Sequence, residues 1–242
     1  MARTAWFDGP LPRILAHRGL ALDVPQNSIG AFRAALAAGA THLETDARAT
    51  ADGTAVLVHD PRLGSDGPEV GSLRLAELRA AAPDVCTLAE ALRALPDARF
   101  NIDVKDVRAA EPVAAAVLAA GAVDRVLLTS FRGSRRRAAL RRLPPVAASA
   151  SSGAVALALA ATRLRLRLAT RAVLAGVDAV QIPERAGSID LTSPDRIAAF
   201  HAAGVEVHFW VVNDPDRMRE LVRRGADGIV TDRPDLAAHA LR

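Results

Sequence analysis

The sequence is poor in sulfur, aromatic rings and lysine. Cys86 is the only cysteine among 242 residues, so the chain can form neither an internal disulfide nor a thiolate cage for a metal, and we expect a reducing compartment. Aromatic residues make up 3% of the chain whereas half of it is hydrophobic, so the buried core must be mainly aliphatic.

Long apolar runs and polar linkers are absent too. The longest apolar run, residues 154–161, is far shorter than the roughly 20 residues that span a bilayer, and residues 1–13 lack the apolar segment of an export signal. No stretch rich in proline, glycine or serine divides the chain. We therefore expect one domain, residues 1–242, in the cytoplasm.

The charge balance is modest, with 31 basic against 27 acidic residues, which suits a small anionic substrate and does not indicate nucleic acid. Thirty of the basic residues are arginine. The one lysine, Lys105, ends an apolar run instead of lying on a charged helix face. We expect this position to need a compact ammonium group, although a single lysine can also survive by chance.

Short β-type runs alternate with helix-length stretches, a pattern typical of a parallel sheet covered by helices. The nine expected strands are residues 13–17, 42–46, 55–59, 100–105, 125–130, 146–149, 179–182, 205–212 and 228–231. The expected helices include residues 28–38, 88–95, 109–120, 135–143, 194–203 and 216–224. A Rossmann arrangement also alternates, but no Gly-x-Gly-x-x-Gly follows the first strand.

The connection between the second and third runs is too short for a crossover helix, so these runs must form an antiparallel hairpin. Asp52-Gly53 favours a two-residue turn, which would place Asp46 opposite His59 with Cβ atoms roughly 5 Å apart. With this hairpin as an insertion after the second strand, eight parallel strands remain. The strand number and chain length predict an α/β fold, the (β/α)8 TIM barrel of about 250 residues.

In such a barrel the reactive groups gather where the strands end. Glu44 and Asp46 are two residues apart in a strand, so their side chains point to one side, and Asp103 ends another run in a similar way. Three converging carboxylates repel one another unless a cation neutralises them, and oxygen-only ligands select Mg²⁺ or Ca²⁺. The alternative is three separate surface acids or helix caps.

Two histidines and two cations lie at the same strand ends. An unperturbed histidine has a pKa near ~6.5, so the residue type of His17 and His59 suits an acid and a base around a phosphate. Arg18 and Lys105 would balance the charge that grows on phosphodiester oxygens. Zinc is the rival explanation of the histidines, but the His-Glu-x-x-His spacing and a Cys/His cluster are both absent. The other histidines are expected to be structural: His42, His201, His208 and His239.

Four further features have two explanations each. Trp210 ends an expected strand and either walls a substrate pocket or packs in the core. Asp232, two residues before a proline, indicates a helix N-cap better than a ligand. Residues 132–142 contain six arginines and fit a solvated helix face better than a nucleic-acid patch. Arginine and leucine alternate at the start of residues 163–171. A basic helix of this kind could contact an anionic membrane surface, but we expect it to be an outer helix of the barrel.

Short motifs spread along nearly the whole chain resemble those of a single known family. They are Ala16-His17-Arg18-Gly19, Pro25-Gln26-Asn27-Ser28, Ala31-Phe32, Glu44-Thr45-Asp46, Thr50-Ala51-Asp52-Gly53, Val58-His59-Asp60, Leu88-Ala89-Glu90, Asn101-Ile102-Asp103-Val104-Lys105, Ser130-Phe131, Trp210-Val211-Val212-Asn213 and Gly228-Ile229-Val230-Thr231-Asp232-Arg233-Pro234. Together they resemble the glycerophosphodiester phosphodiesterase family. The first sixty residues are the most specific part of this likeness.

The resemblance implies a metal-dependent (β/α)8 enzyme that hydrolyses glycerophosphodiesters to an alcohol and sn-glycerol 3-phosphate. It assigns His17 and His59 as general acid and base, Glu44, Asp46 and Asp103 as ligands of Mg²⁺ or Ca²⁺, and Arg18 and Lys105 as phosphate contacts. The chain departs from the family pattern at three positions. Gln26 and Asp103 stand where the family usually has glutamate, and Val211 stands where it has threonine. These departures affect metal preference and substrate choice more than the reaction class.

Three other functions stay open at this point. The same site would suit a lysophospholipase D-type hydrolysis of lysophospholipids. Lys105 would suit a Schiff-base nucleophile in an aldolase-like barrel, although the paired histidines and acids disfavour it. A non-catalytic binding module of the same fold would explain Gln26 and Asp103 as losses. The sequence does not indicate an oligomeric state.

Overall fold

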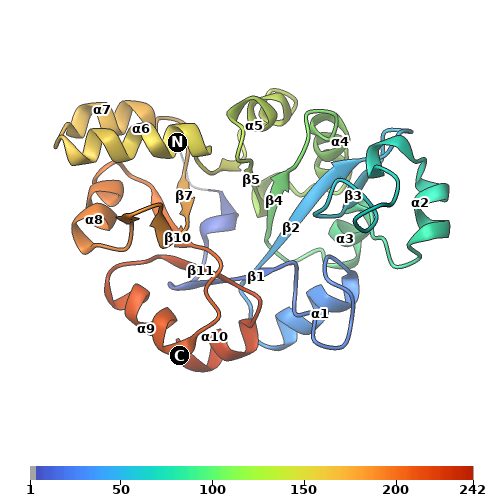
Figure 1. The fold of residues 1–242 in the computed structure, drawn as a ribbon, viewed down its shortest axis with the longest axis horizontal. Helices are drawn as coiled ribbons and strands as arrows, with labels where there is room; N and C mark the ends of the chain where they lie inside the picture. The colour runs from blue at the N-terminus through green and yellow to red at the C-terminus, as the bar shows by residue number, and fades with distance from the viewer. Residues whose placement is uncertain (1–3, 242) are drawn as a thin grey trace.

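The computed structural model describes residues 4–241 and shows the expected (β/α)8 barrel (Figure 1). Its parallel strands follow the order β6-β5-β4-β2-β1-β11-β10-β7, and a parallel bridge between Ser149 and Ala179 joins the two ends of this series. The strands are β1 (Arg13–His17), β2 (His42–Ala49), β4 (Phe100–Val104), β5 (Val126–Thr129), β6 (Ala147–Ala148), β7 (Ala179–Ile182), β10 (Glu206–Phe209) and β11 (Gly228–Thr231).

Alternation along the strands separates the core from the site. In β4, Phe100, Ile102 and Val104 belong to the apolar layer between strands and helices. Asn101 and Asp103, the residues between them, line the cavity inside the barrel. Successive side chains of a strand point to opposite faces, so one short strand serves both layers.

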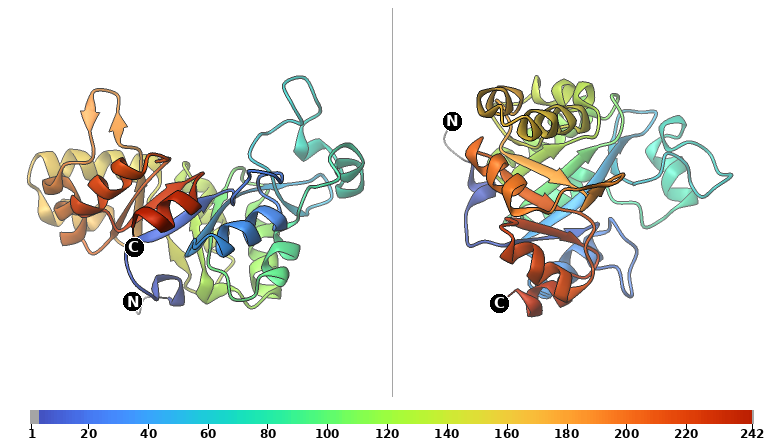
Figure 2. Two further views of the ribbon diagram at one scale, coloured as in Figure 1. Left: turned by 90° about the horizontal axis from the view of Figure 1, so that it is seen from below. Right: turned by 60° about the vertical axis from the view of Figure 1, so that its left-hand side comes forward.

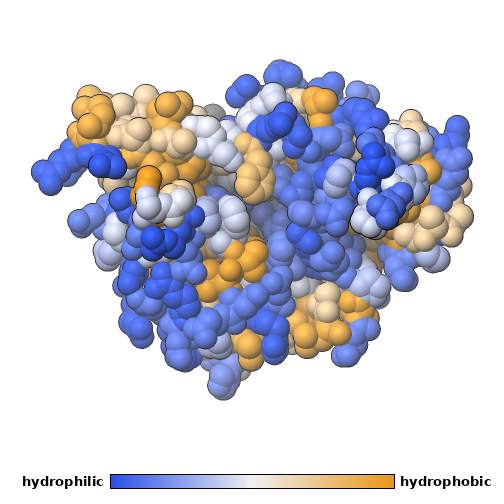
Figure 3. Space-filling model, in the orientation of Figure 1, coloured by the Kyte–Doolittle hydropathy of each residue, from blue (hydrophilic) through white to orange (hydrophobic). Residues whose placement is uncertain are grey.

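The helices begin at the capping residues that the sequence offers. Ser28 Oγ accepts a hydrogen bond from Ala31 N (3.1 Å), and Thr87 and Glu90 form a capping box. The helices within residues 4–241 are α1 (Ile29–Ala37), α2 (Leu75–Ala81), α3 (Leu88–Ala94), α4 (Ala110–Ala119), α5 (Gly133–Leu140), α6 (Ser152–Arg163), α7 (Arg167–Val173), α8 (Pro194–Ala202), α9 (Pro215–Arg223) and α10 (Pro234–Ala240). Figure 3 shows a mostly hydrophilic face with apolar side chains gathered over α6 and α7. None of these helices is long and apolar enough to cross a membrane.

The predicted hairpin is present, but its predicted register is wrong. β3 (Ala55–Leu57) pairs antiparallel with β2, and Ala49 lies opposite Ala55. The loop has three residues instead of two, because Gly53 adopts a left-handed φ of 77° and Thr50 N donates to Thr54 O. The register therefore slips by one residue, and Asp46 pairs with Val58 instead of His59.

A second hairpin was not predicted. β8 (Arg185–Ala186) and β9 (Ile189–Asp190) are two residues each and exposed, so they show no periodic pattern. Figure 2 shows this hairpin and the teal segment after β3 projecting from one end of the molecule. The short helix η1 (Ala5–Phe7) lies at the other end, near the N-terminus.

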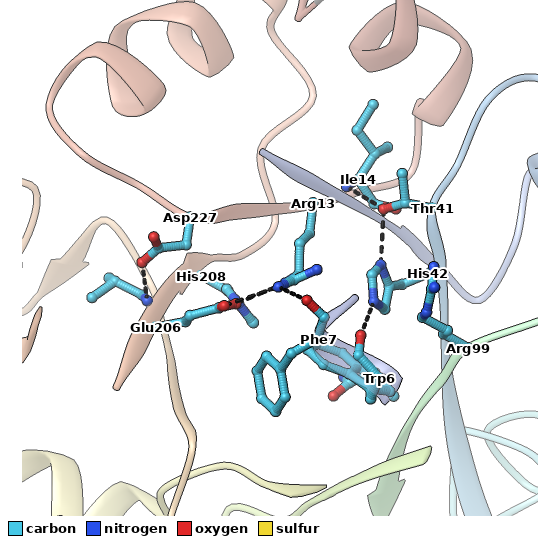
Figure 4. A network of polar contacts seen from close by, with 12 residues as sticks. Trp6, Phe7, Arg13, Ile14, Thr41, His42, Arg99, Glu206, His208 and Asp227 are labelled. Atoms are coloured by element: carbon cyan, nitrogen blue, oxygen red, sulfur yellow. Dashed lines mark hydrogen bonds and ion pairs between the residues drawn. The ribbon is translucent and has the colours of Figure 1, made fainter. Parts of the chain in front are cut away.

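A buried polar network closes that other end of the barrel (Figure 4). Trp6 Nε1 donates to Phe100 O (3.0 Å), and Arg13 makes a bidentate ion pair with Glu206 through contacts of 2.7 and 2.9 Å. His42 Nε2 lies 2.9 Å from Trp6 O, and burial lowers the pKa of His42 to about 3. His42 and His208 are thus structural, as expected.

Glu206→Gln keeps the side-chain volume and removes the charge that faces Arg13. We expect the free energy of unfolding at pH 7 to fall by about 3 kcal/mol, the cost of leaving one buried partner unpaired. Burial acts against the charged form, but hydrogen bonds from Arg13 and His208 lower the pKa of Glu206 from 4.5 to about 2. The stabilisation is therefore full above pH ~4.5 and is lost toward pH ~2.

Urea unfolding at pH 7 and pH 3 measures this contribution. The difference between wild type and Glu206→Gln should be smaller at pH 3, because below pH ~4.5 the Glu206 carboxyl gains a proton in the unfolded chain before it does so in the folded protein, and this lowers the stability of wild type. An equal difference at both pH values would contradict the assignment.

Candidate active site

The structure brings all eight predicted site residues to one cavity of about 490 Å³. Four of them come from the carboxyl ends of β1 and β4 or directly follow them, as the barrel fold predicts, and Glu44 and Asp46 lie within β2, before the residues that pair with β3. The eight residues are His17, Arg18, Glu44, Asp46, His59, Asp103, Lys105 and Trp210.

Three carboxylates and one ammonium group form the floor of this cavity. Asp46 on β2 lies directly opposite Asp103 on β4, and Glu44 lies two residues earlier on β2. All three side chains are buried. Lys105 Nζ lies 2.8 Å from Asp46 Oδ1 and 2.7 Å from Asp103 Oδ2, so the only lysine of the chain bridges two acids.

One lysine does not balance this cluster. Burial, and then the charges of Asp46 and Asp103, raise the pKa of Glu44 well above its usual value. Burial also raises the pKa of Asp103 despite its contact with Lys105. Burial opposes the charge of Asp46 as well, but Lys105 and then Arg18 lower its pKa. The floor therefore holds more potential negative charge than its own cations neutralise.

The donor chemistry of the floor suits a hard divalent cation. Beside Lys105, the groups that converge here are carboxylates, and their oxygens are the ligands that Mg²⁺ and Ca²⁺ prefer. Within residues 4–241, however, no three histidine, cysteine or acidic side chains already stand in a metal-holding arrangement. Asp46 and Asp103 are turned to Lys105 instead. The assignment of Glu44, Asp46 and Asp103 as ligands stays a prediction.

Each of the two histidines has a carboxylate on its Nδ1. His17 Nδ1 lies 2.7 Å from Asp232 Oδ1, and His59 Nδ1 lies 2.8 Å from Asp60 Oδ1. His17 Nε2 is 4.0 Å from Glu44 Oε2, on the cavity side of the ring. A carboxylate on Nδ1 fixes the ring orientation and leaves Nε2 for proton transfer.

The prediction that Asp232 is an N-cap is wrong. The N-cap of α10 is Arg233, and the carboxylate of Asp232 accepts from Asn213 Nδ2 (2.7 Å) as well as facing His17. Pro234 does begin α10, as expected, but the residue before it, Arg233, takes the N-cap position and Asp232 lies outside the helix. Hydrogen bonding to His17, together with Asn213, lowers the pKa of Asp232.

Three residues around the histidines were not predicted to belong to the site. Asp60 holds His59, Asp232 holds His17, and Arg48 donates from Nε and Nη2 to the backbone oxygen of His59 (2.9 and 2.7 Å). Asp60 follows His59 directly in the sequence, which was a usable signal. Arg48 gave none, because its role depends on the hairpin register.

Arg18 lies in a left-handed turn that follows β1. Arg18 has a left-handed φ of 57°, and Gly19 follows with a φ of 88°. Arg18 Nε forms an ion pair with Asp46 (2.9 Å), and Nη1 donates to Gln26 Oε1 (3.2 Å). Gln26 lines a second cavity beside the first, so its effect on the site passes through Arg18.

One wall of the cavity is apolar. Trp210 lines it, packs on the apolar cluster inside the barrel and meets Phe131 edge to face with ring centres 5.8 Å apart. Trp210 therefore both lines the cavity and packs on apolar side chains, and its contact with a substrate stays a prediction. Its neighbours on this wall come from α6, β7 and the segments before α8: Val155, Ala156, Leu159, Ile182, Pro183, Ala186 and Leu191.

Gly19→Ala should disturb both the fold and Arg18. A Cβ at Gly19 would lie 2.7 Å from the backbone carbon of Ala31, at a φ that favours glycine. We expect a loss of about 3 kcal/mol in the free energy of unfolding.

Gly204→Ala is the matched control, because Gly204 has the same φ of 88° and no atom within 4 Å of its Cβ position. That substitution should cost about 1 kcal/mol. Urea unfolding compares the two. Equal losses would show that the close approach to Ala31 is unimportant.

Comparisons with known proteins agree with this geometry. A sequence profile of the Glycerophosphoryl diester phosphodiesterase family matches residues 17–236. The Mycobacterium tuberculosis protein named "Probable glycerophosphodiester phosphodiesterase 2" is 42% identical over 240 residues, which cover 94% of this chain and 89% of that protein.

Solved structures show the same fold. The glycerophosphodiester phosphodiesterase from Agrobacterium tumefaciens superposes with a TM-score of 0.76 and 26% identity over 95% of this chain and 100% of that one. A phosphodiesterase from Oleispira antarctica was solved in complex with the product sn-glycerol-3-phosphate. It superposes with a TM-score of 0.75 and 21% sequence identity, over 96% of this chain and 97% of that one. With a profile that spans most of the sequence and a relative 42% identical over nearly its full length, this chain belongs to the glycerophosphoryl diester phosphodiesterase family.

Proposed function

We propose that this chain is a metal-dependent phosphodiesterase that hydrolyses glycerophosphodiesters to an alcohol and sn-glycerol 3-phosphate. One observation carries the proposal: two imidazoles, each held by a carboxylate, share a cavity with three buried acids and two cations. The names of its relatives and the product bound in the Oleispira antarctica phosphodiesterase support the substrate class. We also propose that residues 1–242 act as one domain.

His17 and His59 are the proposed proton-transfer groups. With Nδ1 donating to Asp232 or Asp60, the Nε2 of each ring is left to take or give a proton. One ring would remove the proton of the attacking water, or of the glycerol 2-hydroxyl on a route through a cyclic phosphate that water then opens. The other ring would protonate the oxygen of the leaving alcohol as its bond to phosphorus breaks. The carboxylate partners stabilise each ring when it becomes positively charged.

The acids and cations are proposed to handle the phosphate charge. Glu44, Asp46 and Asp103 would hold the divalent ion, which when bound polarises a phosphoryl oxygen. Arg18 and Lys105 place a guanidinium and an ammonium beside this position. Both are charged at neutral pH and suit a developing negative charge on oxygen.

The aldolase alternative does not fit Lys105. A Schiff-base nucleophile must be a free amine, which needs a lowered pKa. Burial acts in that direction, but Asp103 and Asp46 outweigh it and raise the pKa of Lys105. The binding-module alternative is disfavoured because both histidines and both of their carboxylate partners are in place.

The direct test is release of sn-glycerol 3-phosphate from glycerophosphocholine or glycerophosphoethanolamine. We expect activity that EDTA abolishes and Mg²⁺ or Ca²⁺ restores. His17→Ala or His59→Ala should lower turnover by roughly 10²-fold or more with little change in folding. His201→Ala, at an exposed histidine outside the cavity, is the control and should keep the wild-type rate. A wild-type rate for His59→Ala would overturn its role.

A second candidate function follows from the apolar wall. Glycerophosphocholine has no long hydrocarbon part, whereas a lysophospholipid would lay its acyl chain along Trp210, Val155 and Leu159. The reaction would be the same phosphodiester hydrolysis, with a lysophospholipase D-type outcome.

Leu159→Gln tests this candidate. We expect kcat/KM for lysophosphatidylcholine to fall about 10-fold and that for glycerophosphocholine to change less than about 2-fold, because only the first substrate uses the wall. Leu118→Gln on α4, an exposed leucine outside the cavity, is the control. Equal effects of Leu159→Gln on both substrates would argue against an acyl-chain site.

A further inference from the structure

One segment of the chain carries charge of a single sign. Residues 125–177 contain eleven arginines and no aspartate or glutamate, which leaves 20 basic residues for all 27 acids of the chain. This segment contains the strands β5 and β6 and the helices α5, α6 and α7, and these helices lie along one edge of the molecule (Figure 1). The small net charge of the chain therefore hides a strongly basic segment.

The helices α6 and α7 pack as outer helices, but their junction does not pack at all. Every residue from 163 to 169 is exposed. Leu164, Leu166 and Leu168 are 67%, 50% and 85% exposed, and Leu157 on α6 is also exposed. An outer barrel helix buries its leucines against the sheet. Here the apolar side chains alternate with arginines on the surface, where Figure 3 shows an apolar patch.

The arginines of this junction have no acidic partners. Among the described residues, 4–241, no ion pair or side-chain hydrogen bond involves Arg163, Arg165, Arg167 or Arg171. On α9 and at its C-cap, by contrast, Arg217, Arg219 and Arg224 all pair with acids. The four arginines at the α6–α7 junction are thus available to an external anion.

We propose that the α6–α7 arm, residues 152–173, docks this enzyme on an anionic lipid membrane. Arginines next to exposed leucines are the combination that binds such a surface: the guanidinium groups contact phosphates and the leucines enter the interfacial layer. Leucines do not favour nucleic acid, for which aromatic side chains would be expected. A dimer formed through this patch would need a second copy of the chain whose surface complements the same leucines and arginines.

The arm also connects the membrane surface to the active site. Ser152, Val155, Ala156 and Leu159, in the first two turns of α6, line the catalytic cavity. Arg163 ends the same helix, which has 12 residues and is therefore roughly 18 Å long. Docking through the far end of α6 holds the cavity close to the lipid headgroups, where amphiphilic phosphodiesters concentrate.

Co-sedimentation with vesicles tests the docking without any substrate. We expect the protein to bind vesicles of 30% phosphatidylserine in phosphatidylcholine at 0.1 M salt, to stay in solution with pure phosphatidylcholine, and to be released at 0.5 M salt. R163Q/R165N/R167Q/R171Q should lower the partition coefficient by about 10²-fold or more. Asparagine is used at Arg165 because that residue has a left-handed φ of 56°.

Two further variants make the result specific. R33Q/R74Q/R93Q/R223Q removes the same charge from four exposed arginines outside residues 125–177, and its partition coefficient should change by less than about 3-fold. L164S/L166S/L168S should lower it by about 10-fold or more. The thermal unfolding midpoint confirms that each variant is folded.

Several outcomes would overturn the proposal. They are no binding of the wild type to anionic vesicles, an equal loss in the control variant, and unchanged binding of the leucine variant. Binding of an oligonucleotide but not of vesicles would instead make the α6–α7 arm a nucleic-acid-binding surface. A dimer in solution that L164S/L166S/L168S dissociates, without vesicle binding, would assign the patch to a second copy.

Discussion

The contact of Lys105 Nζ with Asp46 and Asp103 is the interaction on which the site depends. Two carboxylates face each other across β2 and β4 almost without exposure to water, and a third lies two residues away. Such a group is stable only with positive charge beside it. Lys105 and Arg18 supply part of that charge, while burial and the charges of Asp46 and Asp103 raise the pKa of Glu44.

The two ends of the barrel solve the problem of buried polar groups differently. At the base, the charges of Arg13 and Glu206 match each other, and His42 stays neutral between backbone and threonine partners. At the mouth, the acids outnumber the nearby cations. A polar contact connects the two ends, because Gln181 donates to Asn101 Oδ1 (3.0 Å) and lies 3.4 Å from His208 Nδ1. The end with Arg13 and Glu206 therefore stabilises the fold, and the end with the cavity is suited to binding charged groups.

Much of the fold and site could be predicted from the sequence because both depend on short-range patterns. Apolar runs with helix-length spacers fix eight strands, and the residues at strand ends must then meet at one rim. The hairpin register could not be obtained this way, because one left-handed glycine, Gly53, adds a residue to the loop. Asp232 was misassigned because its partner, His17, is 215 residues away. The exposure of residues 163–169 likewise depends on packing that a sequence pattern shared with outer helices does not show.

The central claim is that Glu44, Asp46 and Asp103 form a cation site beside His17 and His59. A crystal structure determined with Ca²⁺ and sn-glycerol 3-phosphate tests it most directly. The account predicts an ion bound to these three carboxylates, with the phosphate next to Lys105 and Arg18. An ion bound elsewhere, with Asp46 and Asp103 still paired to Lys105 and the phosphate distant from both histidines, would contradict it.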